Sequence, residues 1–138
     1  MAQQYQNQKG GNAPNQKHDL ENRVSDILNM NSLSNEGIDS LLKQIQDYAM
    51  LFAKKLNTSQ LRNIFSKVLK ATTPLSLKLL RPKIIYVAAR QQNNDAKRVV
   101  EFFEGMIQSV DTNEKVKNYQ SFMEAFVAYH KYMSAKPF

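Results

Sequence analysis

Cysteine and tryptophan are both absent from this chain of 138 residues. Without cysteine there is no disulfide, no thiolate metal ligand and no thiol nucleophile. The lack of cysteine fits a reducing compartment, so a cytoplasmic location is expected. Glycine and proline are also sparse, with four residues of each, and the glycines are scattered. A glycine-rich loop that could cradle a phosphate is therefore excluded.

Long apolar runs are missing as well, so no membrane-spanning helix is expected, because such a helix needs about 18 or more consecutive apolar residues. The first 17 residues are rich in Gln and Asn, and their only large apolar residues are Met1 and Tyr5. Such a segment buries too little apolar surface to offset the entropy lost on ordering it. We therefore predict a disordered tail over residues 1–17 and a single domain over residues 18–138.

Patterns typical of a catalytic or metal site are lacking too. The two histidines are His18, at the end of the predicted tail, and His130, on an apolar helix face, where we expect a core histidine with a hydrogen-bonded partner. No His-Glu-x-x-His or paired His-Cys spacing is present for a metal. Glu101 and Glu104 follow basic residues one turn earlier, which indicates an ion-paired surface. We expect no catalytic residue, metal, cofactor or enzymatic activity.

Acidic residues are absent between Asp47 and Asp95, although this stretch carries nine basic residues. They are Lys54, Lys55, Arg62, Lys67, Lys70, Lys78, Arg81, Lys83 and Arg90. Because the whole chain has a formal net charge of +7, the remainder sums to −2 and the positive balance lies in this central third. Clustered like charges weaken folding unless a partner neutralises them. The segregation predicts a surface that faces a polyanion, and nucleic acid is the polyanion we expect.

Apolar residues recur at spacings of three and four from residue 20 onward, which predicts an all-α chain. Short loops between the periodic segments favour a compact antiparallel bundle of five to six helices. The expected helices run from about Leu20 to Met30, from Ser34 or Asn35 to Leu56, from Asn57 to Thr72, from Leu75 to Gln92, from Asp95 to Ser109 and from Thr112 to Ala135. Pro82 lies inside the fourth helix and is expected to kink or break it.

Helix starts are marked by side chains that can cap them. Asn57 or Thr58 can cap the third helix, and Gln60 is placed three residues after Asn57, as a capping-box partner would be. Thr73 is a natural cap for the next helix, because Pro74 suits the first helical position.

Helical wheels place the basic residues opposite the apolar faces. On the third helix Lys67 and Lys70 lie away from the apolar side, and Arg62 lies at its border. On the fourth helix, the face opposite the core carries Leu79, Lys83, Tyr86 and Arg90. Tyr86 thus has a cation one turn before it and one turn after it, which suits phosphate contacts beside a stacked base. Alternatively, Tyr86 packs on a neighbouring helix while both cations are solvated.

Three segments, taken in series, resemble a known family. They are LNTSQLRNIF at residues 56–65, LRPKIIYVAAR at residues 80–90 and FMEAFVAYHK at residues 122–131. The pattern resembles the small helical subunit of type III-A CRISPR (Csm) effector complexes, over roughly residues 35–135.

This resemblance implies a non-catalytic, all-α subunit of an antiviral, RNA-guided complex. Several copies would stack head-to-tail along the guide RNA–target RNA duplex, beside backbone subunits and a Cas10-type large subunit. The basic positions of the family carry over as Arg62, Arg81, Lys83 and Arg90. Together with the charge pattern, the expected RNA-binding residues are Thr58, Ser59, Gln60, Arg62, Lys67, Lys70, Arg81, Lys83, Tyr86 and Arg90.

Two other functions stay open on the sequence. A helical adaptor would use the same basic face to bind an acidic partner protein. A helix-turn-helix DNA-binding protein would use the junction at Thr72–Pro74, which separates two basic helices. The second is the weaker hypothesis, because no helix has the Arg, Asn and Gln cluster at its start that base readout needs.

Overall fold

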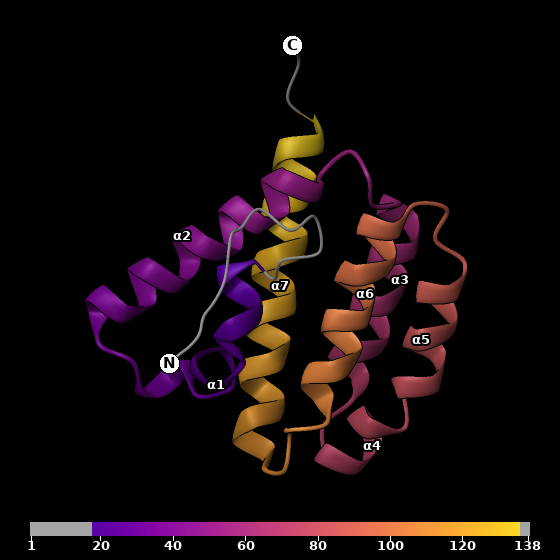
Figure 1. The fold of residues 1–138 in the computed structure, drawn as a ribbon. Helices are drawn as coiled ribbons and strands as arrows, with labels where there is room; N and C mark the ends of the chain where they lie inside the picture. Colours follow the sequence, from indigo (N-terminus) through magenta and orange to yellow (C-terminus); the bar gives the residue numbers. More distant parts are fainter. Residues whose placement is uncertain (1–17, 136–138) are drawn as a thin grey trace, which may run out of the picture.

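The computed structural model describes residues 18–135, and within them it contains helices and no strand (Figure 1). The predicted all-α class is therefore confirmed, whereas the predicted tail over residues 1–17 lies outside the described residues. The elements in chain order are η2 (Asp19–Asn22), α1 (Val24–Leu28), η3 (Met30–Ser32), α2 (Asn35–Phe52), α3 (Thr58–Lys70), α4 (Pro74–Lys78), α5 (Arg81–Ala89), α6 (Asn94–Ile107) and α7 (Asn113–Ala135).

The first predicted helix is replaced by three short pieces, η2, α1 and η3. Such short helices are marginal on their own, so their stability comes from tertiary packing. Leu20, Ile27 and Leu28 supply that packing, since all three side chains are buried in the core. The expected continuous helix from about Leu20 to Met30 was therefore wrong, although apolar residues of this segment do reach the core.

Local capping residues set the starts of the longer helices. Ser34, Asn57, Asn93 and Thr112 cap α2, α3, α6 and α7, because the side-chain oxygen of each accepts a hydrogen bond from the backbone N–H three residues later. Gln60 supplies that N–H for the Asn57 cap. Its side chain does not complete a capping box and bonds the α5–α6 turn instead.

Pro82 separates two helices rather than kinking one. The first, α4, ends at Lys78, and α5 begins at Arg81, so the ring of Pro82 occupies the first turn of a new helix. Thr73 caps α4 through a capping box with Ser76, and Pro74 is the first helical residue, as expected.

The longest helix, α7, forms the centre of the bundle (Figure 1). It packs against α1, α2, α3 and α4. The short helix α5 lies at an edge and packs mainly on α6. Among the described helices, none has the length and apolar character required to cross a membrane.

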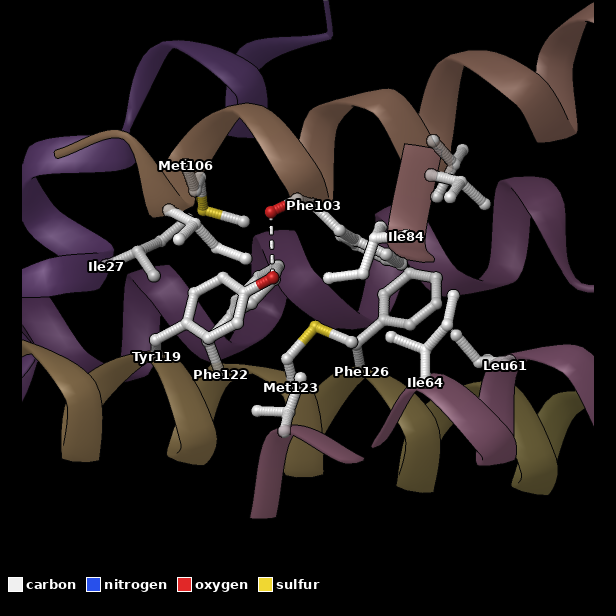
Figure 2. Packing of buried hydrophobic residues seen from close by; sticks show 14 of the residues in the cluster. Ile27, Leu61, Ile64, Ile84, Phe103, Met106, Tyr119, Phe122, Met123 and Phe126 are labelled. Carbon is white, nitrogen blue, oxygen red and sulfur yellow. Dashed lines mark hydrogen bonds between the residues drawn. The ribbon is translucent and has the colours of Figure 1, made fainter. Parts of the chain in front are cut away.

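Aromatic side chains from α6 and α7 fill the core. Phe122 and Phe126 of α7 pack edge-to-face against Phe103 of α6, with ring centroids 5.9 Å and 4.9 Å apart (Figure 2). The hydroxyl of Tyr119 on α7 also donates a 2.7 Å hydrogen bond to the backbone carbonyl of Phe103 on α6, drawn as a dashed line in Figure 2. Each buried aromatic pair of this kind adds about 1 kcal/mol beyond area burial, so these two ring pairs stabilise the contact between α6 and α7.

His130 lies in the core, as predicted, but without the predicted hydrogen-bonded partner. Its side chain is 1% exposed and its ring stacks on Phe126 at a centroid distance of 6.0 Å. Neither ring nitrogen makes a hydrogen bond within the described part of the chain. Helical periodicity showed on which face the imidazole lies, but it carries no information on polar groups that other segments bring near.

Candidate nucleic-acid interface

The segment without acidic residues, between Asp47 and Asp95, includes α3, α4 and α5. Three of its nine cations form ion pairs or hydrogen bonds with α6 or the residue that follows it. Lys55 forms a salt bridge with Asp95, at the start of α6. Arg81 pairs with Glu104 at 2.6 Å, and the Nζ of Lys78 donates to two backbone carbonyls at the end of α6. These cations have no acidic residue near them within their own segment, yet two of them are ion-paired in the folded chain. Because the acids come from a distant segment, the sequence spacing could not reveal them.

Glu104 therefore pairs with Arg81 of α5 rather than with a basic residue of its own helix. The basic residue one turn before Glu101, Arg98, also has a distant partner, since its Nη2 donates to Glu21 at 2.9 Å. The hydroxyl of the buried Tyr48 donates to the same carboxylate at 2.8 Å. The expected pairing along α6 was therefore wrong, and Glu101 makes no ion pair among the described residues. The contacts of Glu21 instead fasten η2 to α2 and α6.

The remaining predicted cations are exposed. Arg62, Lys70 and Lys83 make no hydrogen bond or ion pair among residues 18–135. Lys67 contacts only a neutral side-chain amide, that of Asn63, at 3.2 Å. The helical wheels therefore placed these side chains correctly, and their charges are not neutralised by the part of the protein that the structure describes.

Tyr86 and Arg90 form an exposed pair on α5. The ring of Tyr86 is 62% exposed, so it does not pack into a neighbouring helix. The guanidinium carbon of Arg90 lies 5.7 Å from the ring centroid, which is a cation–π contact. A guanidinium plane beside an exposed ring presents a flat surface on which a nucleobase can stack.

Two depressions lie between α3 and α5 and bring several predicted residues together. The first, the α3–α5 cleft, is small, and Lys67 and Lys83 both line it, beside the apolar side chains of Ile64 and Val87. The second, the polar hollow, has a volume of about 350 Å³. It is lined by Lys54, Lys55, Leu56, Asn57, Gln60, Arg90, Gln91, Gln92 and Asn93.

The polar hollow adds residues that the sequence did not single out. Gln91 and Gln92 were expected at the end of the fourth helix, but they lie outside it, because α5 ends at Ala89. The side chain of Gln91 donates to the side-chain oxygen of Gln60 and to the backbone carbonyl of Val87, which fixes the end of α5 against the start of α3. In the sequence, Gln91 and Gln92 directly follow Arg90, and this position was the available indication that they belong to the site.

The other predicted residues are spread around α3. Arg62 follows Gln60 by two positions and therefore lies roughly 200° around the helix from it. It is exposed, but on the border of α3 that faces away from α5. Ser59 is exposed and Thr58 half-buried in the first turn of α3. The structure thus brings Lys67 and Lys83 together between α3 and α5 and places Arg90 beside Tyr86 on α5, with Arg62 apart from both pairs.

The junction at Thr72–Pro74 does not form a helix-turn-helix. The helix that follows it, α4, has five residues and is too short to act as a recognition helix in a major groove. Within residues 18–135, no group of three or more His, Cys, Asp or Glu side chains is arranged to hold a metal ion.

In a comparison with known protein families, residues 35–136 match the family described as Csm2 Type III-A. The matched region begins at the first residue of α2 and includes α3, α5 and the whole basic surface. No curated protein and no solved structure shows a significant match to the chain. Because the matched residues make up well over half of the sequence, the chain belongs to the Csm2 family and is a small subunit of a type III-A CRISPR (Csm) effector complex.

Proposed function

We propose that this subunit is a non-catalytic RNA-binding scaffold that contacts RNA phosphates through the exposed cations of α3 and α5. The observation that carries the proposal is the set of unneutralised cations along these helices, Lys67, Lys70, Lys83 and Arg90, in a segment without acids. Membership of a type III-A complex supplies the RNA, as the guide strand and its paired target.

The chemistry of the surface favours contact with the RNA backbone over sequence readout. Ammonium and guanidinium groups bind phosphate oxygens in any sequence, and such contacts position a protein without selecting bases. Each phosphate that is neutralised releases condensed counterions, so affinity falls steeply as salt rises. A scaffold that follows a guide of variable sequence requires this behaviour.

The partners in this proposal are the guide RNA, the target RNA, further copies of the chain, the backbone subunits and the Cas10-type large subunit. Exposed apolar side chains support contacts with protein neighbours. Met50 and Leu51 lie at the C-terminal end of α2, whereas Leu75 and Leu79 lie on and next to α4, at the other end of the bundle (Figure 1). Because these patches differ and lie at opposite ends, a contact between them would be head-to-tail and would build an open stack.

The test is an RNA-binding titration of the full chain, alone and in the assembled complex, at two salt concentrations. Removing Lys67, Lys83 and Arg90 together by substitution with Ala should weaken binding to RNA. The slope of log affinity against log salt should flatten by about 0.7 for each phosphate of a single strand that the variant no longer binds. Lys117→Ala with Lys131→Ala, which removes exposed cations of α7, is the control and should bind like the wild type.

The same titration separates the alternatives. If the wild-type chain bound no RNA at low salt in either form, the proposal would be wrong and the acidic-partner adaptor would replace it. A preference for duplex DNA over RNA would instead favour a DNA-binding role. Unchanged affinity in the triple variant would show that RNA does not bind the basic surface of α3 and α5.

A further inference from the structure

The polar hollow differs chemically from the cationic surface beside it. It opens where the α2–α3 turn meets the α5–α6 turn, and Leu56 is the single apolar residue in its described lining. Its volume, about 350 Å³, is that of a small-ligand site. Side-chain amides make up most of its wall, so its chemistry is not that of a simple anion site.

Hydrogen bonds within the wall leave several amide groups available. The NH₂ group of Gln91 donates to Gln60 and Val87, and that of Asn93 donates to the carbonyl of Lys55. The NH₂ group of Gln60 and the side-chain oxygen of Gln91 have no partner among the described residues. Gln92 is exposed, and its side-chain amide makes no hydrogen bond within residues 18–135. The hollow therefore presents donors and acceptors side by side.

This mixture matches the edge of a nucleobase better than a phosphate. A phosphate oxygen only accepts hydrogen bonds, so it would leave the oxygens of Gln91 and Gln92 unused. The edge of a base carries donors and acceptors together, and Asn or Gln amides pair with such edges through two hydrogen bonds.

Arg90 connects the hollow to the stacking surface of α5. Its side chain lines the hollow and also lies over the exposed ring of Tyr86. A base that enters the hollow would pass along the guanidinium plane, on which bases stack.

We infer that the polar hollow receives a single unpaired nucleotide of the bound RNA, with its base on the amides of Gln60, Gln91 and Gln92. This inference rests on the proposed function, because it requires RNA held on the same surface. Bases inside an A-form duplex keep their pairing edges occupied, so a nucleotide that leaves the helix is the form that can enter. The site would give a scaffold that ignores sequence a preference for one local RNA shape.

The test compares two RNA duplexes of the same sequence, one fully paired and one with a single bulged 2-aminopurine nucleotide. The full-length wild-type chain should bind the bulged duplex about three- to tenfold more tightly, as expected for one or two added hydrogen bonds. Because 2-aminopurine emission responds to stacking, it should change on binding.

Two variants and a control make the test specific. Gln92→Leu and Gln60→Leu keep the side-chain size but remove the amide, and both should lose the preference for the bulge. Gln92 is exposed and contributes no hydrogen bond to the described fold, so this variant stays informative even if Gln60→Leu weakens the packing of α3. Gln108→Leu removes an exposed amide at the opposite end of α6 and should keep the preference.

The outcomes distinguish this inference from the function on which it rests. Equal wild-type affinity for the two duplexes, or a preference that Gln92→Leu leaves intact, would overturn the inference while RNA binding stood. Equal loss of affinity for both duplexes in Gln92→Leu would show phosphate binding instead and would also overturn it. Failure of every form to bind RNA would overturn the proposed function and this inference together.

Discussion

At the scale of single residues, His130 is notable because its imidazole ring is buried. Both ring nitrogens lack hydrogen-bond partners in the described part of the chain. Burial among apolar side chains lowers its pKa below the usual 6.5, and a hydrogen bond toward the Ala53 backbone would act in the opposite direction. Burial is the larger of the two influences, and neither ring nitrogen makes a hydrogen bond among the described residues. Burial therefore favours the neutral imidazole in the folded protein.

The neutral imidazole makes stability depend on pH. In the unfolded chain His130 takes up a proton below about pH 6.5, whereas in the folded chain it takes up that proton only at lower pH. The unfolded state thus binds more protons, and the free energy of unfolding should be constant above about pH 7.5 and fall as the pH drops through 6.5.

Denaturant titrations between pH 5 and pH 8 measure this dependence, with His130→Met as the comparison. The variant places an apolar side chain without a titratable group at this core position, so its free energy of unfolding should fall less as the pH is lowered. The other histidine, His18, is present in both proteins, so the difference between them reports on position 130 alone. An identical slope for the two proteins would contradict the assignment.

A second prediction concerns the hydroxyl of Tyr119, which is buried and donates to the carbonyl of Phe103. Tyr119→Phe removes the donor and should lower the free energy of unfolding by about 1 kcal/mol, the usual net value of such a bond. Tyr86→Phe is the matched control, because that ring is exposed. Chemical denaturation of both variants gives the difference, and equal stability would show that the hydrogen bond contributes nothing.

At the scale of elements, the helices that were predicted well are those defined by local features. Asn57, Thr73 and Thr112 mark their helix starts because a capping side chain acts on the backbone three residues later. The apolar spacing that follows each cap shows which face is buried. These signals lie within a few residues of each other, so the sequence alone was sufficient.

Features that depend on distant segments could not be predicted in the same way. The partner of Arg81 is Glu104, which lies on another helix, and the wall of the polar hollow combines two separate turns. Helical wheels predict that a cation points outward, but they do not tell whether a neighbouring helix supplies a carboxylate there. The exposed cations of the candidate site were therefore predictable, and the hollow was not.

The α4 cap offers a test at this scale. Thr73→Ala removes the capping box that Thr73 forms with Ser76 and should cost about 1 kcal/mol of stability. Its neighbour Thr72 is exposed and makes no hydrogen bond in the described structure, so Thr72→Ala should change stability little. Thermal denaturation of the two variants gives the comparison, and an equal loss would show that the capping box is unimportant.

At the scale of the whole molecule, the structure separates cations that hold the fold from cations that face outward. Arg81 pairs with Glu104, whose side chain is only 16% exposed, whereas Lys83 is exposed and unpaired among the described residues. Although they are two residues apart in the sequence, Arg81 therefore stabilises the fold, whereas Lys83 is available to a ligand. A carboxylate left without its partner in a mostly buried position costs free energy, and an exposed lysine does not.

Arg81→Met and Lys83→Met each remove one positive charge, but the first should mainly lower stability and the second should mainly lower RNA affinity. Arg81→Met should lower the free energy of unfolding by about 1–3 kcal/mol and change RNA affinity less. Lys83→Met should leave stability within about 0.5 kcal/mol of wild type and weaken RNA binding. Denaturant titration and RNA titration of both proteins test the pair, and a Lys83→Met protein that bound RNA like wild type would remove α5 from the proposed interface.

The position of α5 at the edge of the bundle also has a consequence for motion. This helix has nine residues, buries Ile84 and Ala88, and packs mainly on α6, whereas α7 is held by helices on several sides. Local opening should therefore expose the amides of α5 to deuterium exchange well before those of α7. If RNA holds Lys83 and Arg90, the same amides should become slower to exchange, so a helix that opens early would be the one that the ligand rigidifies.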